Sequence, residues 1–174
     1  METRIEVFTK EHFPDSIGNE IASEIVHIGI TSVDEIRMVQ VYLVEGDLSS
    51  EDIRRICGEL LIDGLTQDYI CIDGSPNVQA GKIKLGPKWQ GNNVHAIEVT
   101  RKLGVMDPVE STVVKGIKDL GLNASSVKTA KKFLIAGQLT TGQLETIANK
   151  VLANKIIEDV FIDKDNLFYE GKNE

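Results

Sequence analysis

The chain of 174 residues is 41% hydrophobic, which supports a packed core and argues against disorder. Its net charge of −8 disfavours nucleic acid as a partner, and no stretch approaches the run of about 20 apolar residues that a membrane helix needs. Residues 1–4 are polar and lead directly into a strand-like segment, so we expect no signal peptide and a cytoplasmic protein.

The first part of the chain predicts two helices between extended segments. Residues 4–9 alternate apolar and polar side chains, as a half-buried strand does. Asp15 suits the N-cap of a helix that ends near Gly29. Residues 33–44 are extended, and residues 69–72 form a last strand. Between them Ser49 or Ser50 starts a second helix, whose apolar stripe consists of Ile53, Ile56, Cys57, Leu60 and Leu61.

Residues 74–93 are expected to form a linker, because four glycines and two prolines fall between residues 73 and 93. The alternating Ile83-Lys84-Leu85 and the single tryptophan, Trp89, indicate that this linker packs on the body, with room for a short added strand. Its glycines do not match the pattern of a phosphate loop. Their spacing is wrong, and Ile83 stands where such a loop needs Ser or Thr.

The second part repeats the order of the first. It has extended segments at 96–101, 127–136 and 160–163, with helices at 108–120 and 141–153. Asp107 caps the first of these helices and Pro108 starts it, while Thr140 and Gln143 fit a capping box for the second. The apolar stripe also returns at the same spacing, in Leu144, Ile147, Ala148, Val151 and Leu152.

The chain is therefore one unit written twice. Ile5-Glu6-Val7 falls on Ile97-Glu98-Val99 without a gap, and after a slip of one residue Gly46 falls on Gly137. Residues 1–73 hold 5 Lys/Arg against 16 Asp/Glu, whereas residues 94–174 hold 11 of each. A solvated acidic face would explain this excess. The alternative is that the two copies face different neighbours.

These elements predict an α+β fold. Each unit is β-α-β-α-β, and its long middle stretch can supply two strands, which gives a βαββαβ unit related to the ferredoxin-like fold. Two helices would cover one face of an antiparallel sheet and leave the other face in need of a partner. A unit of roughly 70 residues is marginal alone. We therefore expect an intramolecular pseudo-twofold dimer, with repeats at 1–73 and 94–164 and a polar tail at 165–174.

The residues point to no catalytic, cofactor or metal site. His12, His27 and His95 have no acidic or cysteine companions at ligand spacing, and no nucleophile elbow or Cys-His signature is present. Cys57 and Cys71 are predicted to be buried, reduced thiols. A cluster of lysines fits either an anionic partner or a strand edge guarded by lysine; its members are Lys128, Lys131 and Lys132.

Three runs of the second copy carry a family resemblance: Gly104-Val105-Met106-Asp107-Pro108, residues 116–121 and residues 150–159. Together they resemble PurS, the small subunit of phosphoribosylformylglycinamidine (FGAM) synthase. The first copy resembles the same family less closely, and it has Phe13-Pro14-Asp15-Ser16 at the start of its first helix. The residues that carry the family motif, in a structural or an interface role, are Gly104, Asp107, Pro108, Gly121, Asn154, Glu158 and Asp159.

The resemblance implies a part in de novo purine synthesis without catalytic residues of its own. A PurS-like protein would bridge the PurL synthetase and the PurQ glutaminase, which supplies ammonia to PurL. The chain would be a tandem PurS, or the PurS-dimer-like N-terminal domain of a longer PurL, and further self-association stays open. The alternative is a tandem ACT-like module that binds a regulatory ligand. Residues 11–14 lack the glycine-rich loop that such a module needs.

Overall fold

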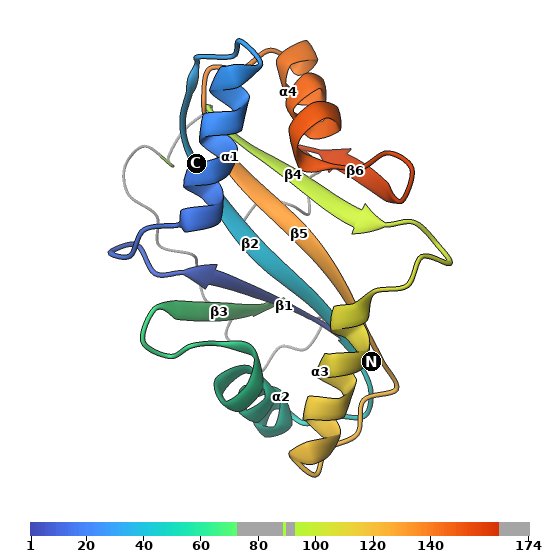
Figure 1. Cartoon of the computed structure of the whole chain (residues 1–174). Helices are drawn as coiled ribbons and strands as arrows, with labels where there is room; N and C mark the ends of the chain where they lie inside the picture. The colour runs from blue at the N-terminus through green and yellow to red at the C-terminus, as the bar shows by residue number, and fades with distance from the viewer. Residues whose placement is uncertain (73–88, 90–92, 164–174) are drawn as a thin grey trace.

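The computed structural model describes residues 1–72, 89 and 93–163, whose strands form one six-stranded antiparallel sheet with helices on one face (Figure 1). The order of strands is β3-β1-β2-β5-β4-β6. The strands are β1 (Glu2–Thr9), β2 (Val33–Glu45), β3 (Gln67–Ile72), β4 (Val94–Arg101), β5 (Ser126–Gly137) and β6 (Glu158–Ile162). The helices are α1 (Ser16–His27), α2 (Ser50–Ile56), α3 (Pro108–Asp119) and α4 (Thr141–Ile147).

The two units join edge to edge through their long strands. β2 and β5 pair from Val33 opposite Gly137 to Glu45 opposite Ser126. At the centre Gln40 lies opposite Lys131, its own counterpart in the duplicated sequence, so a pseudo-twofold axis passes between them. The predicted α+β class and the pseudo-twofold pairing of two related units are confirmed.

One detail of the prediction is wrong. The long middle stretch of each unit forms a single strand rather than two, so each unit contributes three strands. β2 contains no glycine or proline that would turn the chain. The sister copy also does not cover the open face of its twin. It extends the sheet instead, which removes the unpaired edges that β2 and β5 would otherwise expose.

Each of the two cores under the helices is built from both units. In one core Ile56 of α2 packs with Ile117 of α3, and both are fully buried. In the other, Ile25 of α1 lies with Ile147 of α4. Figure 1 shows this exchange, with α2 beside α3 at one end and α1 beside α4 at the other. Since a single unit buries too little surface, this sharing explains why the copies stay together.

The helix starts agree with the sequence, but two helix ends do not. Asp15, Ser49, Asp107 and Thr140 each accept a backbone hydrogen bond as N-caps. α2 and α4, however, each pass into a π-helical turn at matching positions, Cys57–Leu61 and Ala148–Leu152. The face opposite the helices is partly covered by Trp89, whose indole N–H donates to Glu35 at 3.1 Å. The other linker residues from 73 to 92 and the tail from 164 lie outside the described residues.

Candidate functional site

Asp15 and Asp107 link the N-terminal ends of α1 and α3 to the long strands β2 and β5 by hydrogen bonds. Asp107 accepts a hydrogen bond from the backbone N–H of Val109 at 3.0 Å with one carboxylate oxygen, and from the hydroxyl of Thr129 with the other. Asp15 accepts from the N–H groups of Gly18 and Met38, both at 2.8 Å. Both carboxylates are buried. They therefore hold α1 and α3 at fixed positions on β2 and β5.

The other motif residues around α3 shape the backbone. Gly104 has φ +83° and Gly121 has φ +78°, and a Cβ at either would meet no atom within 4 Å. The backbone angle, and not crowding, therefore requires glycine at both positions. Pro108 occupies the first turn of α3. At the C-terminal end of α3, the Gly121 N–H donates to the carbonyl of Lys118 at 2.9 Å, and this bond caps the helix.

Asn154 and Glu158 close the loop that leads into β6. The Asn154 N–H donates to the Glu158 carboxylate at 2.9 Å, and the Asn154 side-chain oxygen accepts from Ile156 N–H at 3.1 Å. Asp63 and Gln67 make the matching bonds in the first unit, at 2.9 Å between them and 3.0 Å from Leu65 N–H. Asp159 lies in β6 opposite Thr100.

The fold brings Gly104 and Asn154 to the same end of the second unit, because Lys102 N–H donates to the carbonyl of Ile157 at 2.8 Å. Gly121 lies at the far end of α3. We call the second-unit entrance surface the combination of residues 101–106, residues 154–157 and the exposed side of α3. The first-unit entrance surface comprises residues 9–14, residues 63–66 and the exposed side of α1, where Lys10 N–H donates to Thr66 at 2.8 Å.

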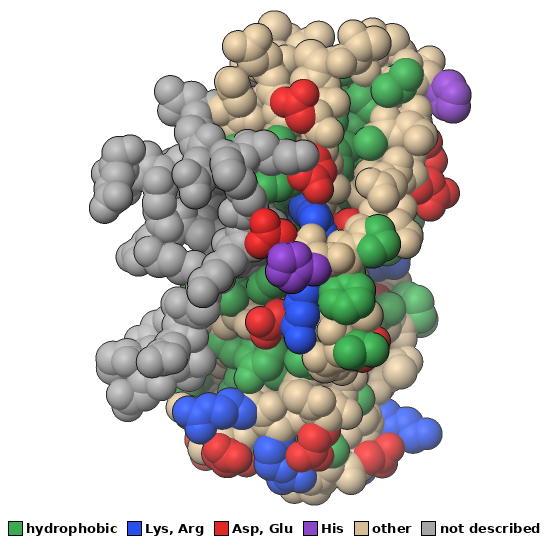
Figure 2. All heavy atoms as spheres, turned by 90° about the vertical axis from the view of Figure 1, so that its left-hand side faces the viewer, with side chains coloured by type: hydrophobic (Ala, Val, Ile, Leu, Met, Phe, Trp, Pro, Cys, Tyr) green, Lys and Arg blue, Asp and Glu red, His purple; other side chains and the backbone are tan. Residues whose placement is uncertain are grey.

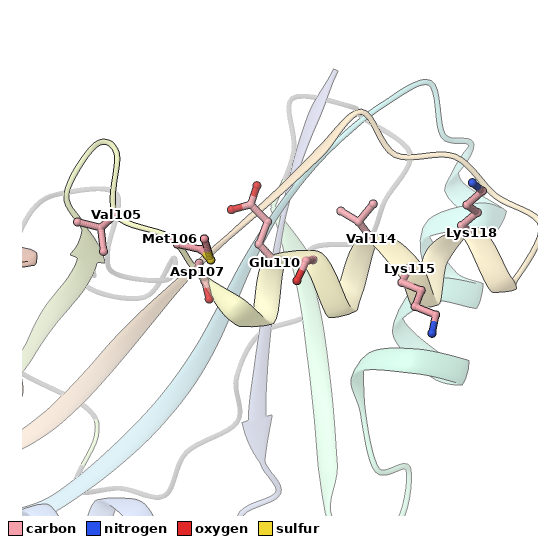
Figure 3. A pocket seen from close by; sticks show the side chains of 8 residues that line it. Val105, Met106, Asp107, Glu110, Val114, Lys115 and Lys118 are labelled. Carbon is pink, nitrogen blue, oxygen red and sulfur yellow. The ribbon is translucent and has the colours of Figure 1, made fainter.

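A shallow groove of about 520 Å³ runs along the second-unit entrance surface. Figure 3 shows Val105 and Met106 in the loop that leads into α3, and Lys115 and Lys118 further along the same helix. Glu110 also lines the groove. The groove thus combines apolar side chains with both signs of charge.

A second cluster of charged groups lies buried on the face opposite the helices, where the two units meet. Arg4 donates to Glu6 at 2.8 Å and to Glu98 of the other unit at 2.6 Å. The ammonium of Lys132 lies 3.3 Å from the carboxylate of Glu6. Two positive and two negative groups therefore neutralise one another, and all but the partly exposed Arg4 are buried.

The pKa values of the two cations shift in opposite directions. Burial lowers the pKa of Lys132, and attraction to Glu6 offsets this only in part. Burial also pushes the pKa of Arg4 down, but the charges of Glu6 and Glu98 outweigh it, so that pKa is raised. Glu6 is 0% and Lys132 1% exposed, so the cluster offers no open site for a ligand. Its groups bind one another and join the units.

The sequence does not predict this cluster. It predicts an anionic partner or a strand edge for Lys132, which instead lies buried in a central strand. A signal was present: in the aligned copies Lys132 falls on Val41, and Arg4 falls on Ala96. Charged residues at positions where the twin is apolar indicate either exposure or a buried pair. Lys128 and Lys131 are exposed.

His95 and the two cysteines make contacts within the fold. His95 lies 2.8 Å from Asp163, whose other oxygen accepts from Ala96 N–H at 2.9 Å. Cys57 and Cys71 are buried thiols that form no disulfide, as predicted. Within the described ranges no group of three or more His, Cys, Asp or Glu residues is placed to hold a metal ion. The helices described are all too short or too polar to cross a bilayer.

These features define a class: a tandem α+β protein whose two homologous units share one sheet and present two related helix entrances. The protein-family model of PurS, described as phosphoribosylformylglycinamidine (FGAM) synthase, matches residues 2–72 and again residues 94–166. The chain belongs to the PurS family, in tandem duplication, and the family connects it with FGAM synthase of purine biosynthesis. A search of curated proteins finds no match to the chain.

Proposed function

We propose that the protein is a non-catalytic bridge within FGAM synthase, which joins the PurL synthetase to the PurQ glutaminase in the cytoplasm. The family match over both units supports a place in this enzyme. The observation that carries the bridging role is the pair of entrance surfaces, which are related by the pseudo-twofold axis and lie at the left and right of one sheet in the view of Figure 1.

The shared cores suit this role. Because α1 packs with α4 and α2 with α3, the repeats at 1–73 and 94–164 cannot separate without exposing both cores. A rigid body with two related surfaces holds its partners at a fixed distance. Covalent linkage of the repeats also replaces association of two chains by a high effective concentration. The same reasoning holds for a tandem PurS and for the corresponding domain of a longer PurL.

The test is reconstitution with purified PurL and PurQ from the same organism. A bridge should co-elute with both on size exclusion, and it should raise the glutamine-dependent rate of FGAM formation. The rate with ammonium chloride in place of glutamine is the control, because free ammonia needs no delivery from PurQ. Co-elution with neither subunit and an unchanged glutamine-dependent rate would contradict the proposal.

A further inference from the structure

We propose that Arg37, Glu35 and Trp89 form a latch that fixes the loop before α1, and that the second unit lacks such a latch. We call this loop, residues 10–14, the first-unit entrance loop. Its counterpart, residues 102–106, is the second-unit entrance loop. The inference concerns the order of the two loops in the chain by itself, so it does not depend on the proposed bridging function.

The guanidinium of Arg37 in β2 holds the first-unit entrance loop from the strand beside it. It donates to the carbonyl of Phe13 at 3.3 Å with one terminal nitrogen and to the carbonyl of Glu11 at 3.4 Å with the other. The planar fork of arginine suits such paired contacts. Figure 2 faces the side of the molecule that bears this loop, where acidic and basic side chains lie close together. One side chain thus bridges two carbonyls of the same loop.

Glu35 links Arg37 to Trp89 through the two oxygens of one carboxylate. One oxygen lies 3.3 Å from Nε of Arg37, and the other accepts from the indole N–H of Trp89 at 3.1 Å. Trp89 in turn packs against the apolar cluster on the face opposite the helices, which contains Val39 and Val41 of β2. The Arg37 side chain is 12% exposed and that of Glu35 24%. Each member of the latch therefore restricts the next, from the face of the sheet to the loop.

The second unit carries different residues at these positions. In the aligned copies Lys128 falls on Arg37, and Ser126 falls on Glu35. Lys128 is exposed, and within the described part of the chain its ammonium makes no hydrogen bond to the second-unit entrance loop. The duplicated unit has thus acquired or kept the latch in one copy alone.

The two loops contain the same internal hydrogen bond, so their order can be compared directly. Phe13 N–H donates to the carbonyl of Lys10 at 3.0 Å, and Val105 N–H donates to the carbonyl of Lys102 at 3.1 Å. These are matching positions of the two copies. Opening either loop breaks this bond, but in the first unit it must also break the contacts of Arg37. Hydrogen exchange of the two amides therefore reports the latch, because exchange follows local opening.

The latch makes the two entrance surfaces unequal before any partner binds. A loop that is already fixed loses less conformational freedom on binding, so a partner of the first-unit surface meets a preformed shape. The second-unit entrance loop exposes Leu103 and Met106, at 105% and 83%, and is not held in this way. The fold therefore combines one preformed and one adaptable surface on the same sheet.

The experiment measures hydrogen exchange of the Phe13 and Val105 amides by NMR in the full chain, corrected for their intrinsic rates. In the wild type, Phe13 should exchange roughly tenfold more slowly than Val105, because hydrogen bonds to a charged group must open with it. Arg37→Lys places the residue of the second unit in the first. This variant should bring the two rates within about twofold of each other, since lysine lacks the paired donors.

Two further variants test the rest of the latch. Glu35→Ser, again the residue of the second unit, should accelerate exchange at Phe13 and shift the fluorescence of Trp89, the only tryptophan, to longer wavelength. Trp89→Phe keeps an aromatic ring without the N–H donor and should accelerate Phe13 by about twofold to threefold. The matched control, Lys128→Met, should leave both loop amides unchanged. The amide of Val41 in the middle of β2 is the reference for global opening.

The same measurements can overturn the inference. Equal protection of Phe13 and Val105 in the wild type would contradict a latch, and so would an Arg37→Lys variant whose Phe13 amide exchanges as in the wild type. Acceleration of Val41 by the same factor as Phe13 would mean that Arg37 stabilises the whole fold and not the loop. Unchanged exchange in Trp89→Phe would remove Trp89 from the latch. The bridging function is tested separately and stands or falls without these results.

Discussion

The ammonium of Lys132 lies 3.3 Å from the carboxylate of Glu6, although the two residues belong to different units and are 126 positions apart in the chain. Glu6 also accepts from Arg4, which reaches Glu98 of the second unit. A buried network of this kind adds little net stability compared with apolar residues of similar size. Removing only one member of the network is costly, however, because the charge of its partner then stays buried and unpaired.

Replacing Lys132 alone should therefore destabilise the protein. In Lys132→Met, Arg4 is left to neutralise both Glu6 and Glu98, and we expect the free energy of unfolding to fall by about 3 kcal/mol. The measurement is urea denaturation followed by circular dichroism. Lys131→Met is the matched control, because this neighbour is exposed and should change stability by less than about 0.5 kcal/mol. Equal effects of the two substitutions would contradict the buried-pair account.

A double substitution separates the charge pair from simple packing. Adding Glu6→Gln to Lys132→Met removes the carboxylate charge that Lys132 helped to neutralise, so the double variant should be more stable than the sum of the two single effects predicts. We expect a coupling free energy of about 1–3 kcal/mol from the four urea curves. Additive effects would mean that Lys132 and Glu6 contribute independently.

The sequence predicts those structural features whose signal lies in a few neighbouring residues. Asp15, Asp107 and Thr140 were recognised as helix caps because a cap depends on a few neighbouring residues. The π-helical turns after α2 and α4 could not be foreseen, because the apolar stripe that passes through Cys57 and Ala148 is equally compatible with a continuous α-helix.

How the two units join could not be predicted from any local sequence pattern. A three-stranded unit exposes both an edge along its long strand and an uncovered face, and periodicity does not say which of them meets the sister copy. Gln40 and Lys131 at the centre of the joint are polar, so hydrophobicity did not mark it. The contacts of Lys132 could not be predicted for the same reason, because its partners lie on strands that only folding brings together.

The helix cap at Asp107 gives the next prediction. Asp107→Ala removes the bond to Val109 N–H and the tie to Thr129, and we expect a loss of about 2 kcal/mol in the free energy of unfolding. The control is Asp119→Ala at the other end of α3. Removing a negative charge from a helix C-terminus should be neutral or slightly stabilising. A loss under about 0.5 kcal/mol for Asp107→Ala would show that the cap contributes little.

Substitution of Gly18 should destabilise the protein, because this glycine lies close to the backbone of strand β2. A Cβ at this position would lie 2.1 Å from the backbone carbonyl oxygen of Ile36, which cannot move without shifting β2. We expect Gly18→Ala to lower the free energy of unfolding by about 3 kcal/mol. Gly142→Ala in α4 is the control, since its new Cβ would have only the Thr140 hydroxyl at 4.0 Å. This change should stabilise the protein by about 0.5 kcal/mol.

The buried thiol of Cys57 should make the protein less stable in alkali. Its hydrogen bond with Cys71 and its burial raise the pKa of Cys57 far above the usual 9.0, so the folded state keeps a proton that the unfolded chain loses above this pH. The unfolded state then binds fewer protons, and stability falls as pH rises, by at most about 1.4 kcal/mol per pH unit for one group. Urea curves from pH 8 to pH 10.5 should show this decline. In Cys57→Ala the free energy of unfolding is lower throughout because of the cavity, but its dependence on pH should be flatter. An equal slope in the wild type and the variant would show that the thiol is not the group responsible.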